Sequence, residues 1–576
     1  MKVFAELKRR RVFRAGLLYV VVAWAVIQAA DIILPRLGVP DWAVTFVIVA
    51  AGLGLPIALV LAWLYDINPD PAHAAAGHAG SRRVFAFLGI GLLIGLVGFA
   101  AYVKYERGSE AATPSDGDVV DAASIAVLPF VNMSADPEQE YFSDGLTEEL
   151  LNALAQVSAL RVAARTSSFS FKGKNLPVAE IARALNVRTV LEGSVRKANN
   201  RVRITAQLIN ASDGYHIWSQ TFDRELTDIF AIQEEISRSI AGALQVRLAA
   251  TDSASLRREQ HDLSAYDLYL RARFYWNKRN QTSLREALAL LERAIEIDPE
   301  FARAHAALAD VYGVWNDYAT TRDAAMVAKS IASAQRALQL DSTLAEPYAA
   351  LGNAYHQSLR FREAQAAFRR AIAMKPGYAT THQWYAWSLL HTGNAAAALH
   401  EIETALRLDP LSLIINENKA EHLLFSGRYD EALAQFRHTL ELDSTFTVTY
   451  PFLALTYSLL GDHANALRWA ERTLARPEYG VYDMGHAAYV LALAGQTQRA
   501  RALLAEMERR SFWAMMAPGY LALGDTARAL AVLEKDYELG GSAPLLEQLS
   551  ANPALAPLRT HPRFRALRQK LGLDSI

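Results

Sequence analysis

The feature that most constrains the fold of this 576-residue chain is a spacing of 34 residues that recurs in its carboxy-terminal half. Small residues repeat at this spacing, and bulky apolar residues keep a helical period between them. The repeating positions are Ala364, Ala398, Ala432 and Ala466, together with Gly393, Gly427, Gly461 and Gly495. A repeat of this length with helical patterning predicts a solenoid of stacked helix pairs. We expect about eight pairs over residues 260–545 and a carboxy-terminal cap helix over residues 546–576.

The unit at residues 345–378 shows how each helix pair is built. Tyr348 and Leu351 supply bulk on the first helix, whereas Gly352 and Ala364 are small where two helices must approach closely. Pro376 ends the second helix because proline has no amide donor. This unit resembles the tetratricopeptide (TPR) repeat family, and the resemblance implies that the solenoid binds other proteins.

A curved stack of helix pairs leaves a groove lined by the first helix of each repeat. By repeat position, we expect seven side chains to face this groove and to contact a partner, although a generic surface role is at least as compatible with each of them. They are Asn353, His356, Gln383, Trp387, His391, Glu417 and Glu421. This mixture differs from the lysine and asparagine clamp of chaperone-binding TPR proteins, so the sequence does not imply recognition of a terminal carboxylate.

Three apolar runs precede the folded part of the chain. They cover about residues 12–34, 43–65 and 84–105, and each has the length of about 20 residues that a membrane-spanning helix needs. The expected anchor therefore occupies residues 1–107. Gly91 and Gly95 form a G-x-x-x-G pair that favours packing of the third helix in a homodimer, although glycine is also common in membrane helices generally.

The distribution of cations predicts the orientation of this anchor. Lysines and arginines precede the first and third runs, which places the amino terminus in the cytoplasm. Residues after about 105 are then periplasmic, and the expected location is a bacterial inner membrane. Residues 108–123 are small, polar and acidic, as in a flexible linker.

Residues 124–250 predict a small α+β domain. A buried strand at SIAVLPF precedes a helix, and the alternation of Val202, Ile204, Ala206 and Leu208 with polar residues predicts a hairpin with one solvated face. The segments SIAVLPF, YFSDGLTEELLNAL, RTSSFSFKGK and ARALNVRTVLEGSVRK resemble the TolB amino-terminal-like domain of bacterial envelope and signalling proteins. In that family a cyclase domain or a winged helix can precede this domain, and residues 1–123 match neither.

Composition restricts the classes of function. The formal net charge is -1, so no global basic field attracts nucleic acid, and we expect no nucleic-acid partner. The absence of cysteine excludes disulfides and thiolate metal sites. No common catalytic or phosphate-binding motif occurs, so we expect no enzyme activity, no cofactor and no metal.

The sequence thus predicts a mostly α fold with three transmembrane helices, a small TolB-like α+β domain and a TPR solenoid. The expected function is a membrane-tethered periplasmic scaffold or sensor that binds other proteins, expected to be those of the cell envelope, through the TPR groove. The alternative is a small-ligand sensor that uses the TolB-like domain to signal across the membrane.

Overall fold

The computed structural model describes residues 19–24, 26–28, 123–157, 159–246, 261–318, 323, 325–476, 479–541 and 543–573. Contacts divide the chain into two units, Met1–Asp118 and Val119–Ile576. In the first unit, the described residues 19–24 and 26–28 are helical. The fold described below is that of the second unit.

The predicted fold class needs one correction, which concerns the three transmembrane helices. In the part of the chain that the structure describes, no helix is both long and apolar enough to cross a membrane. Apart from the two short helical stretches at residues 19–28, the predicted spans lie outside the described residues, as do Gly91, Gly95 and the linker. The described fold is therefore mostly helical, with a solenoid of helix pairs and one small sheet domain. The predicted location stays a prediction.

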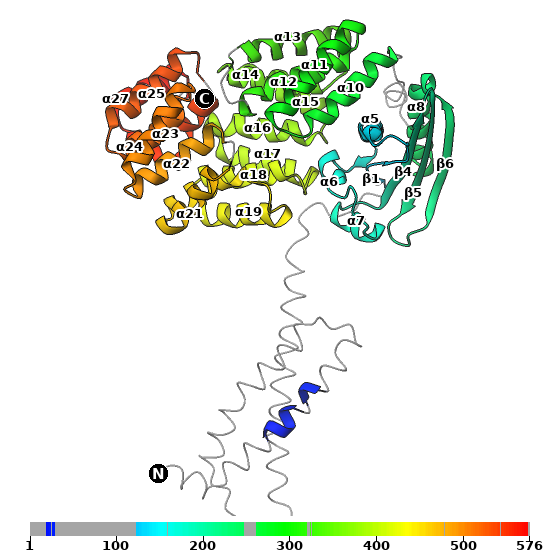
Figure 1. The fold of residues 1–576 in the computed structure, drawn as a ribbon, viewed down its shortest axis with the longest axis horizontal. Coiled ribbons are helices and arrows are strands. Elements are labelled where there is room, and N and C mark those ends of the chain that lie inside the picture. The colour runs from blue at the N-terminus through cyan, green and yellow to red at the C-terminus, as the bar shows by residue number, and fades with distance from the viewer. Residues whose placement is uncertain are drawn as a thin grey trace, which may run out of the picture. The chain divides into compact units, whose positions relative to one another are not determined.

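The sheet domain follows a β-α-β order and ends in a hairpin, a third long strand and a helix (Figure 1). Its strands are β1 (Ser124–Val127), β2 (Val131–Asn132), β3 (Arg161–Val162), β4 (Thr189–Ala198), β5 (Arg201–Asn210) and β6 (His216–Glu225). Its helices are η3 (Pro137–Gln139), α5 (Glu140–Leu154), α6 (Arg165–Phe169), α7 (Val178–Ala184), η4 (Leu226–Asp228) and α8 (Ile229–Ala243).

The sheet has the order β3-β1-β4-β5-β6. Strand β1 runs parallel to β3 and β4, whereas β4, β5 and β6 are antiparallel. The apolar residues predicted to alternate along β5, such as Val202 and Leu208, are completely buried with Leu150 of α5 and Ile236 of α8. Helix α7 packs on the other face through Ile181. Burial of apolar side chains on both faces explains why this short sequence forms a stable sheet.

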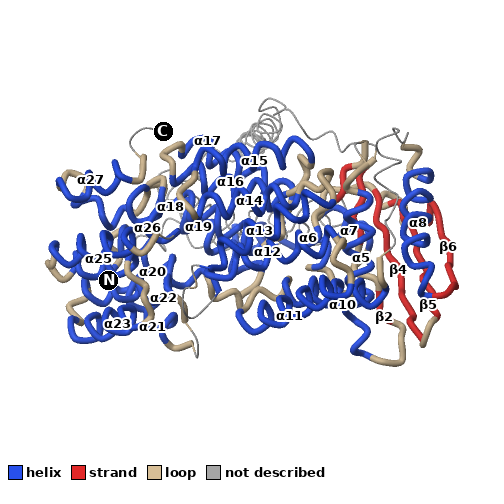
Figure 2. The backbone as a smooth tube through the Cα atoms, turned by 90° about the horizontal axis from the view of Figure 1, so that it is seen from above, coloured by secondary structure: helices blue, strands red, loops and turns tan. Residues whose placement is uncertain are grey.

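Eight helix pairs follow in the described residues, and Figure 2 shows them forming the rest of the unit beside the strands. The first helices are α10 (Leu263–Trp276), α12 (Ala302–Tyr318), α14 (Glu346–Gln357), α16 (Ala379–His391), α18 (Leu413–Phe425), α20 (Thr449–Leu459), α22 (Val481–Leu493) and α24 (Ala517–Ala522), the last preceded by η5 (Ala514–Met516). The second helices are α11 (Gln281–Ile297), α13 (Ala325–Leu340), α15 (Phe361–Met374), α17 (Ala395–Leu408), α19 (Tyr429–Leu442), α21 (His463–Leu474), α23 (Thr497–Arg509) and α25 (Thr526–Glu538).

The repeating small residues lie where the helix pairs require them. Gly393 has a φ of 86° in the turn between α16 and α17, a conformation that glycine adopts without steric cost. A Cβ atom on Gly352 would lie 2.6 Å from the ring of Phe368, so only glycine allows α14 and α15 to approach this closely. Ala364 of α15 and Ala398 of α17 are completely buried and belong to one apolar cluster.

The chain ends in a segment that folds back onto the solenoid. Residues predicted as one cap helix form α26 (Ala543–Ser550), η6 (Pro553–Leu558) and α27 (Pro562–Lys570). Helix α26 contacts α16, which lies more than 150 residues earlier, as well as α25, α27 and η5. We call residues 543–558 the groove segment.

Candidate functional site

The first helices of the central repeats form an inner face, and six of the seven predicted partner-binding residues lie together on it. His356 of α14 and His391 of α16 contact each other, with 3.0 Å between their ring nitrogens. The ring of Trp387 lies 5.2 Å from that of His391. Asn353 lies apart from this group and donates a hydrogen bond to the carbonyl of Gly313 on α12 at 3.1 Å.

A single asparagine joins the remaining predicted residues. Asn418 of α18 accepts hydrogen bonds from Gln383 Nε2 at 2.7 Å and from Trp387 Nε1 at 3.2 Å. Its amide nitrogen donates to Glu417 at 2.8 Å and to Glu421 at 3.0 Å. Asn418 therefore uses both of its acceptor positions and both donor hydrogens inside the protein. Its four partners are among the residues predicted from repeat position, whereas Asn418 itself is not.

The inner face is not an open groove, because the groove segment covers it. Gln383, His391, Glu417 and Glu421 are all less than one-tenth exposed. Alanines of the groove segment, Ala551 and Ala554, share a buried cluster with Leu389 of α16, Phe425 of α18 and Phe452 of α20. Leucines of α26 pack into a second cluster with α22 to α25. The site predicted for a partner is thus occupied by the protein's own helix.

The groove segment also brings a third acid to this face. Glu547 of α26 is 2% exposed and lies near Glu417 and Glu421, which are 1% and 5% exposed. We call these three side chains the acid cluster. In the described part of the chain no ion pair joins any of the three to a cation.

The electrostatics of the acid cluster follow from this lack of cations. Burial raises the pKa of Glu547 to about 8, with the charge of Glu417 adding to the effect. Burial also raises the pKa of Glu417 to about 7, although hydrogen bonds from Glu421 and Asn418 oppose the rise. Burial, followed by the charge of Glu417, raises the pKa of Glu421 as well. Near neutral pH the cluster therefore holds protons that carboxyl groups in water have lost.

The neighbouring histidines are neutral for the same reason. Burial lowers the pKa of His356 and of His422 to about 4, and it lowers the pKa of His391 well below its ordinary value. Within the described residues, no group of three or more histidine and acidic side chains is arranged to hold a metal ion. The chemistry available at the inner face is thus hydrogen bonding, apolar contact and proton uptake.

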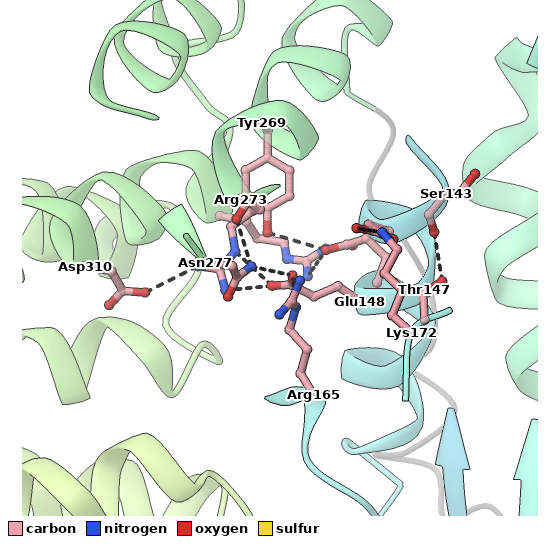
Figure 3. A network of polar contacts seen from close by, with 12 residues as sticks. Ser143, Thr147, Glu148, Arg165, Lys172, Tyr269, Arg273, Asn277 and Asp310 are labelled. Carbon is pink, nitrogen blue, oxygen red and sulfur yellow. Dashed lines mark hydrogen bonds and ion pairs between the residues drawn. The ribbon is translucent and has the colours of Figure 1, made fainter. Parts of the chain in front are cut away.

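A second polar site joins the sheet domain to the first repeats, and Figure 3 shows it. Glu148 of α5 accepts hydrogen bonds from Arg273 of α10 at 2.6 and 2.9 Å, and from Arg165 at 2.7 Å. Asn277 donates to the same carboxylate at 3.2 Å. We call these four residues the domain joint. Burial acts to raise the pKa of Glu148, but Arg273 and Arg165 outweigh it and lower the pKa to about 2.

Other contacts make the sheet domain and the repeats one packed unit. Glu149 pairs with Arg303 of α12, with one nitrogen to oxygen distance of 2.8 Å. Ser167 of α6 donates to Asp409, which lies just after α17, through both its amide and its hydroxyl. The buried apolar cluster of the sheet domain continues into α10, α11 and α12.

A cavity of about 950 Å³ lies between these two parts. It is lined by α5, α8 and β3 of the sheet domain and by turns of the first four repeats. Gln233 of α8 lines it, is 1% exposed, and donates to the hydroxyl of Tyr266 at 2.6 Å. Its amide oxygen has no hydrogen-bond partner in the described structure. Buried amide oxygens normally accept a hydrogen bond, so the unpaired state of this atom is unusual.

Two family models match the chain, each over a limited part. Residues 349–412 and 386–445 match the tetratricopeptide repeat, which together with the helix pairs confirms the predicted TPR repeats. Residues 121–239 match the second domain of HilA/YgeH-like transcriptional regulators. The resemblance of this region to the TolB amino-terminal-like domain stays a prediction.

One curated relative shares a third of the chain. It is named "Putative adenylate cyclase 3", comes from Rhizobium meliloti (strain 1021), and is 50% identical over 201 residues. The match covers 34% of this chain and 34% of the relative, so the chain spans about a third of that protein's length.

Similar solved structures are repeat proteins. A Pseudomonas aeruginosa PilF structure is 19% identical over 37% of this chain and 93% of its own, with a TM-score of 0.29. A thermophilic TPR protein of Thermus thermophilus is 21% identical over 36% of this chain and 99% of its own, with a TM-score of 0.28. Scores this low carry no argument about function.

Proposed function

We propose that this chain is a non-catalytic scaffold that binds a helical segment of a partner protein on the inner face of its TPR solenoid. The observation that carries the proposal is that this face already binds a helix, α26, from a distant part of the same chain. Proteins commonly recognise a partner by binding the apolar side chains of an amphipathic helix in a groove. The activity in the name of the Rhizobium meliloti relative belongs to that protein, and our proposal assigns none of it to this chain.

Selection from a displayed library of helical peptides tests the proposal. Asn418 positions Gln383, Trp387, Glu417 and Glu421 through its four hydrogen bonds. Peptides enriched on the full chain are therefore expected to lose affinity at least tenfold, or about 1.4 kcal/mol, when Asn418 is replaced by alanine. Arg428→Ala serves as the control, because Arg428 lies outside the inner face and is paired with Glu431 at the surface. If no enriched peptide depends on Asn418, or none is enriched, the proposed function is wrong.

A second candidate function is binding of a small polar ligand in the cavity between the sheet domain and the repeats. The unpaired amide oxygen of Gln233 favours it. A ligand that binds only the folded state raises the melting temperature. We expect a hit from a thermal-shift panel of polar metabolites to lose its effect in Gln233→Leu, and a panel without any stabilising compound contradicts this second function.

A further inference from the structure

The groove segment is a poor match for the charge of the face that it covers. It brings Glu547 close enough to interact electrostatically with Glu417 and Glu421, and all three acids are at most 5% exposed. An ionised carboxylate that is buried needs a cation as its partner. Without one, each of these acids retains its proton. The groove segment supplies no such cation, because residues 543–558 contain no lysine, arginine or histidine.

The other charged or titratable groups around the groove segment do not change this balance. Tyr482 of α22 interacts with the three acids and with Asp317 of α12, and neither Tyr482 nor Asp317 carries a positive charge. Asp536 of α25 accepts from the amide of Ala514. Arg568 of α27 donates to the carbonyl of Leu549, at the end of α26, so its charge is directed at the helix terminus. The unmet requirement of the inner face is thus a cation opposite Glu417 and Glu421.

We propose that the inner face binds a basic amphipathic helix of the partner, and that the groove segment is an intramolecular occupant which that helix displaces. The inference rests on the proposed function and names its ligand class. A lysine or arginine at the position of Glu547 pairs with Glu417 and Glu421, while small residues at the positions of Ala551 and Ala554 preserve the apolar contacts. The groove segment thereby acts as an autoinhibitory plug that excludes weaker ligands.

The apolar contacts explain why the plug stays in place without a partner. Leu546 and Leu549 of α26 are almost completely buried, as is Leu555 of η6. Attachment to the same chain adds a high effective concentration, so a modest intrinsic affinity suffices for docking. A partner helix in solution lacks this effective concentration and must bind with higher intrinsic affinity than the groove segment. The ion pairs with Glu417 and Glu421 supply that extra affinity.

Fluorescent peptides of residues 543–558 test the inference on the full chain. Three peptides are compared by fluorescence anisotropy near neutral pH: the native one, Glu547→Gln and Glu547→Lys. We expect the lysine peptide to bind at least tenfold more tightly than the native peptide, with the glutamine peptide between them. This preference should disappear in the chain variant Glu417→Gln/Glu421→Gln, because the charge that selects the lysine is gone.

A matched pair of chain variants tests the displacement. Ala551 is 7% exposed against the inner face, whereas Ala556 of the same segment is exposed. Ala551→Arg is expected to release the plug and to strengthen binding of the lysine peptide at least tenfold, while Ala556→Arg leaves it unchanged. If the two variants bind alike, or the native peptide binds as tightly as the lysine peptide, the inference is wrong.

A measurement on the unsubstituted chain covers the case in which Ala551→Arg does not fold. Saturating lysine peptide should accelerate amide hydrogen exchange in residues 543–558 and leave exchange in α10 unchanged. Unchanged exchange with the peptide bound, or failure of the peptide to bind, overturns the inference. If the enriched library peptides depend on Asn418 but carry no basic residue, the proposed function stands and only the proposal of a basic ligand is wrong.

Discussion

The domain joint and the acid cluster are two buried sites built around glutamate, and they differ in their cations. Glu148 is surrounded by Arg165 and Arg273, which hold it ionised, whereas Glu417 and Glu547 have no cation beside them and retain protons. A buried charge with paired cations stabilises one packing of the helices that carry it. A buried acid without a cation leaves its contact open to replacement by a segment that supplies one. We infer that the joint holds the sheet domain in place and that the acid cluster belongs to a contact that can open.

The largest expected effect is on the domain joint. Glu148→Gln removes the ion pairs that Arg165 and Arg273 make with this carboxylate and leaves Arg273 only Asp310 at 3.7 Å, which costs about 3–5 kcal/mol of unfolding free energy. Urea denaturation measures it. Glu363→Gln is the control, because its pair with Arg360 lies at the surface and is expected to change stability by less than about 1 kcal/mol. A loss below about 1 kcal/mol in Glu148→Gln would show that the joint does not hold the domains together.

The next-largest effect is that of pH on the stability of the two sites. Rising pH weakens the acid cluster, whereas falling pH weakens the domain joint. The acids of the cluster have raised pKa values, so docking of the groove segment is strongest below the ordinary glutamate value of 4.5 and weakens as pH rises through about 7 to 8. In that window the docking equilibrium falls by up to about tenfold per pH unit for each linked proton. The pKa of Glu148 is lowered, so its contribution is complete above pH 4.5 and is lost only as pH falls towards 2.

Hydrogen exchange, corrected for the intrinsic effect of pH, measures this difference. Residues 543–558 should lose protection between about pH 6 and pH 8, while α5 and α10 keep theirs. Equal loss of protection in both regions would contradict the distinction between the two sites.

A smaller effect is expected when one acid of the cluster is made permanently neutral. Glu547→Gln keeps the shape of the side chain and removes its ionisation, so it should stabilise docking at about pH 9 by on the order of 1 kcal/mol and flatten the pH profile. Thermal unfolding at about pH 6 and pH 9 measures the change. Glu534→Gln is the matched control on α25, where the glutamate pairs with Arg563 at the surface, and it should leave the profile unaltered.

The smallest effect is expected at Asp310, which combines features of both sites. Burial raises its pKa to about 7 even though a nitrogen of Arg273 lies 3.7 Å from its carboxylate. Asp310→Asn should therefore change the unfolding free energy by less than about 1 kcal/mol near pH 6, with a slight gain near pH 9. A loss of several kcal/mol would place Asp310 with the ionised pairs of the joint.

The repeat architecture could be predicted from the sequence because each repeat is a local pattern. Gly393 and Ala398 belong to sets that recur every 34 residues, and the family match confirms the repeats that they indicate. All of the predicted inner-face residues except Asn353 contact one another directly or through Asn418, but their environment could not be foreseen. Nothing near Glu547 in the sequence marks it as a neighbour of Glu417, since this contact depends on how the solenoid curves and on where the chain returns.

The domain joint escaped prediction for a related reason. Glu148 lies in the buried part of α5, and its partner Arg273 is 125 residues further along the chain. Buried charges such as Glu148 and Glu149 give no periodic signal, and the partner of Glu148 could be identified only after the sheet domain was packed on α10. The transmembrane helices were predicted from apolar length alone, and the described helices give them no support.

The most direct test of the central claim measures the position of the groove segment while a basic helix binds. Because the chain contains no cysteine, Ala556→Cys and Glu403→Cys place two spin labels at exposed positions on the segment and on α17. Electron double resonance should give one narrow distance distribution for the free chain and a broader, longer one as the Glu547→Lys peptide saturates it. A peptide that binds and leaves the narrow distribution unchanged would contradict the account.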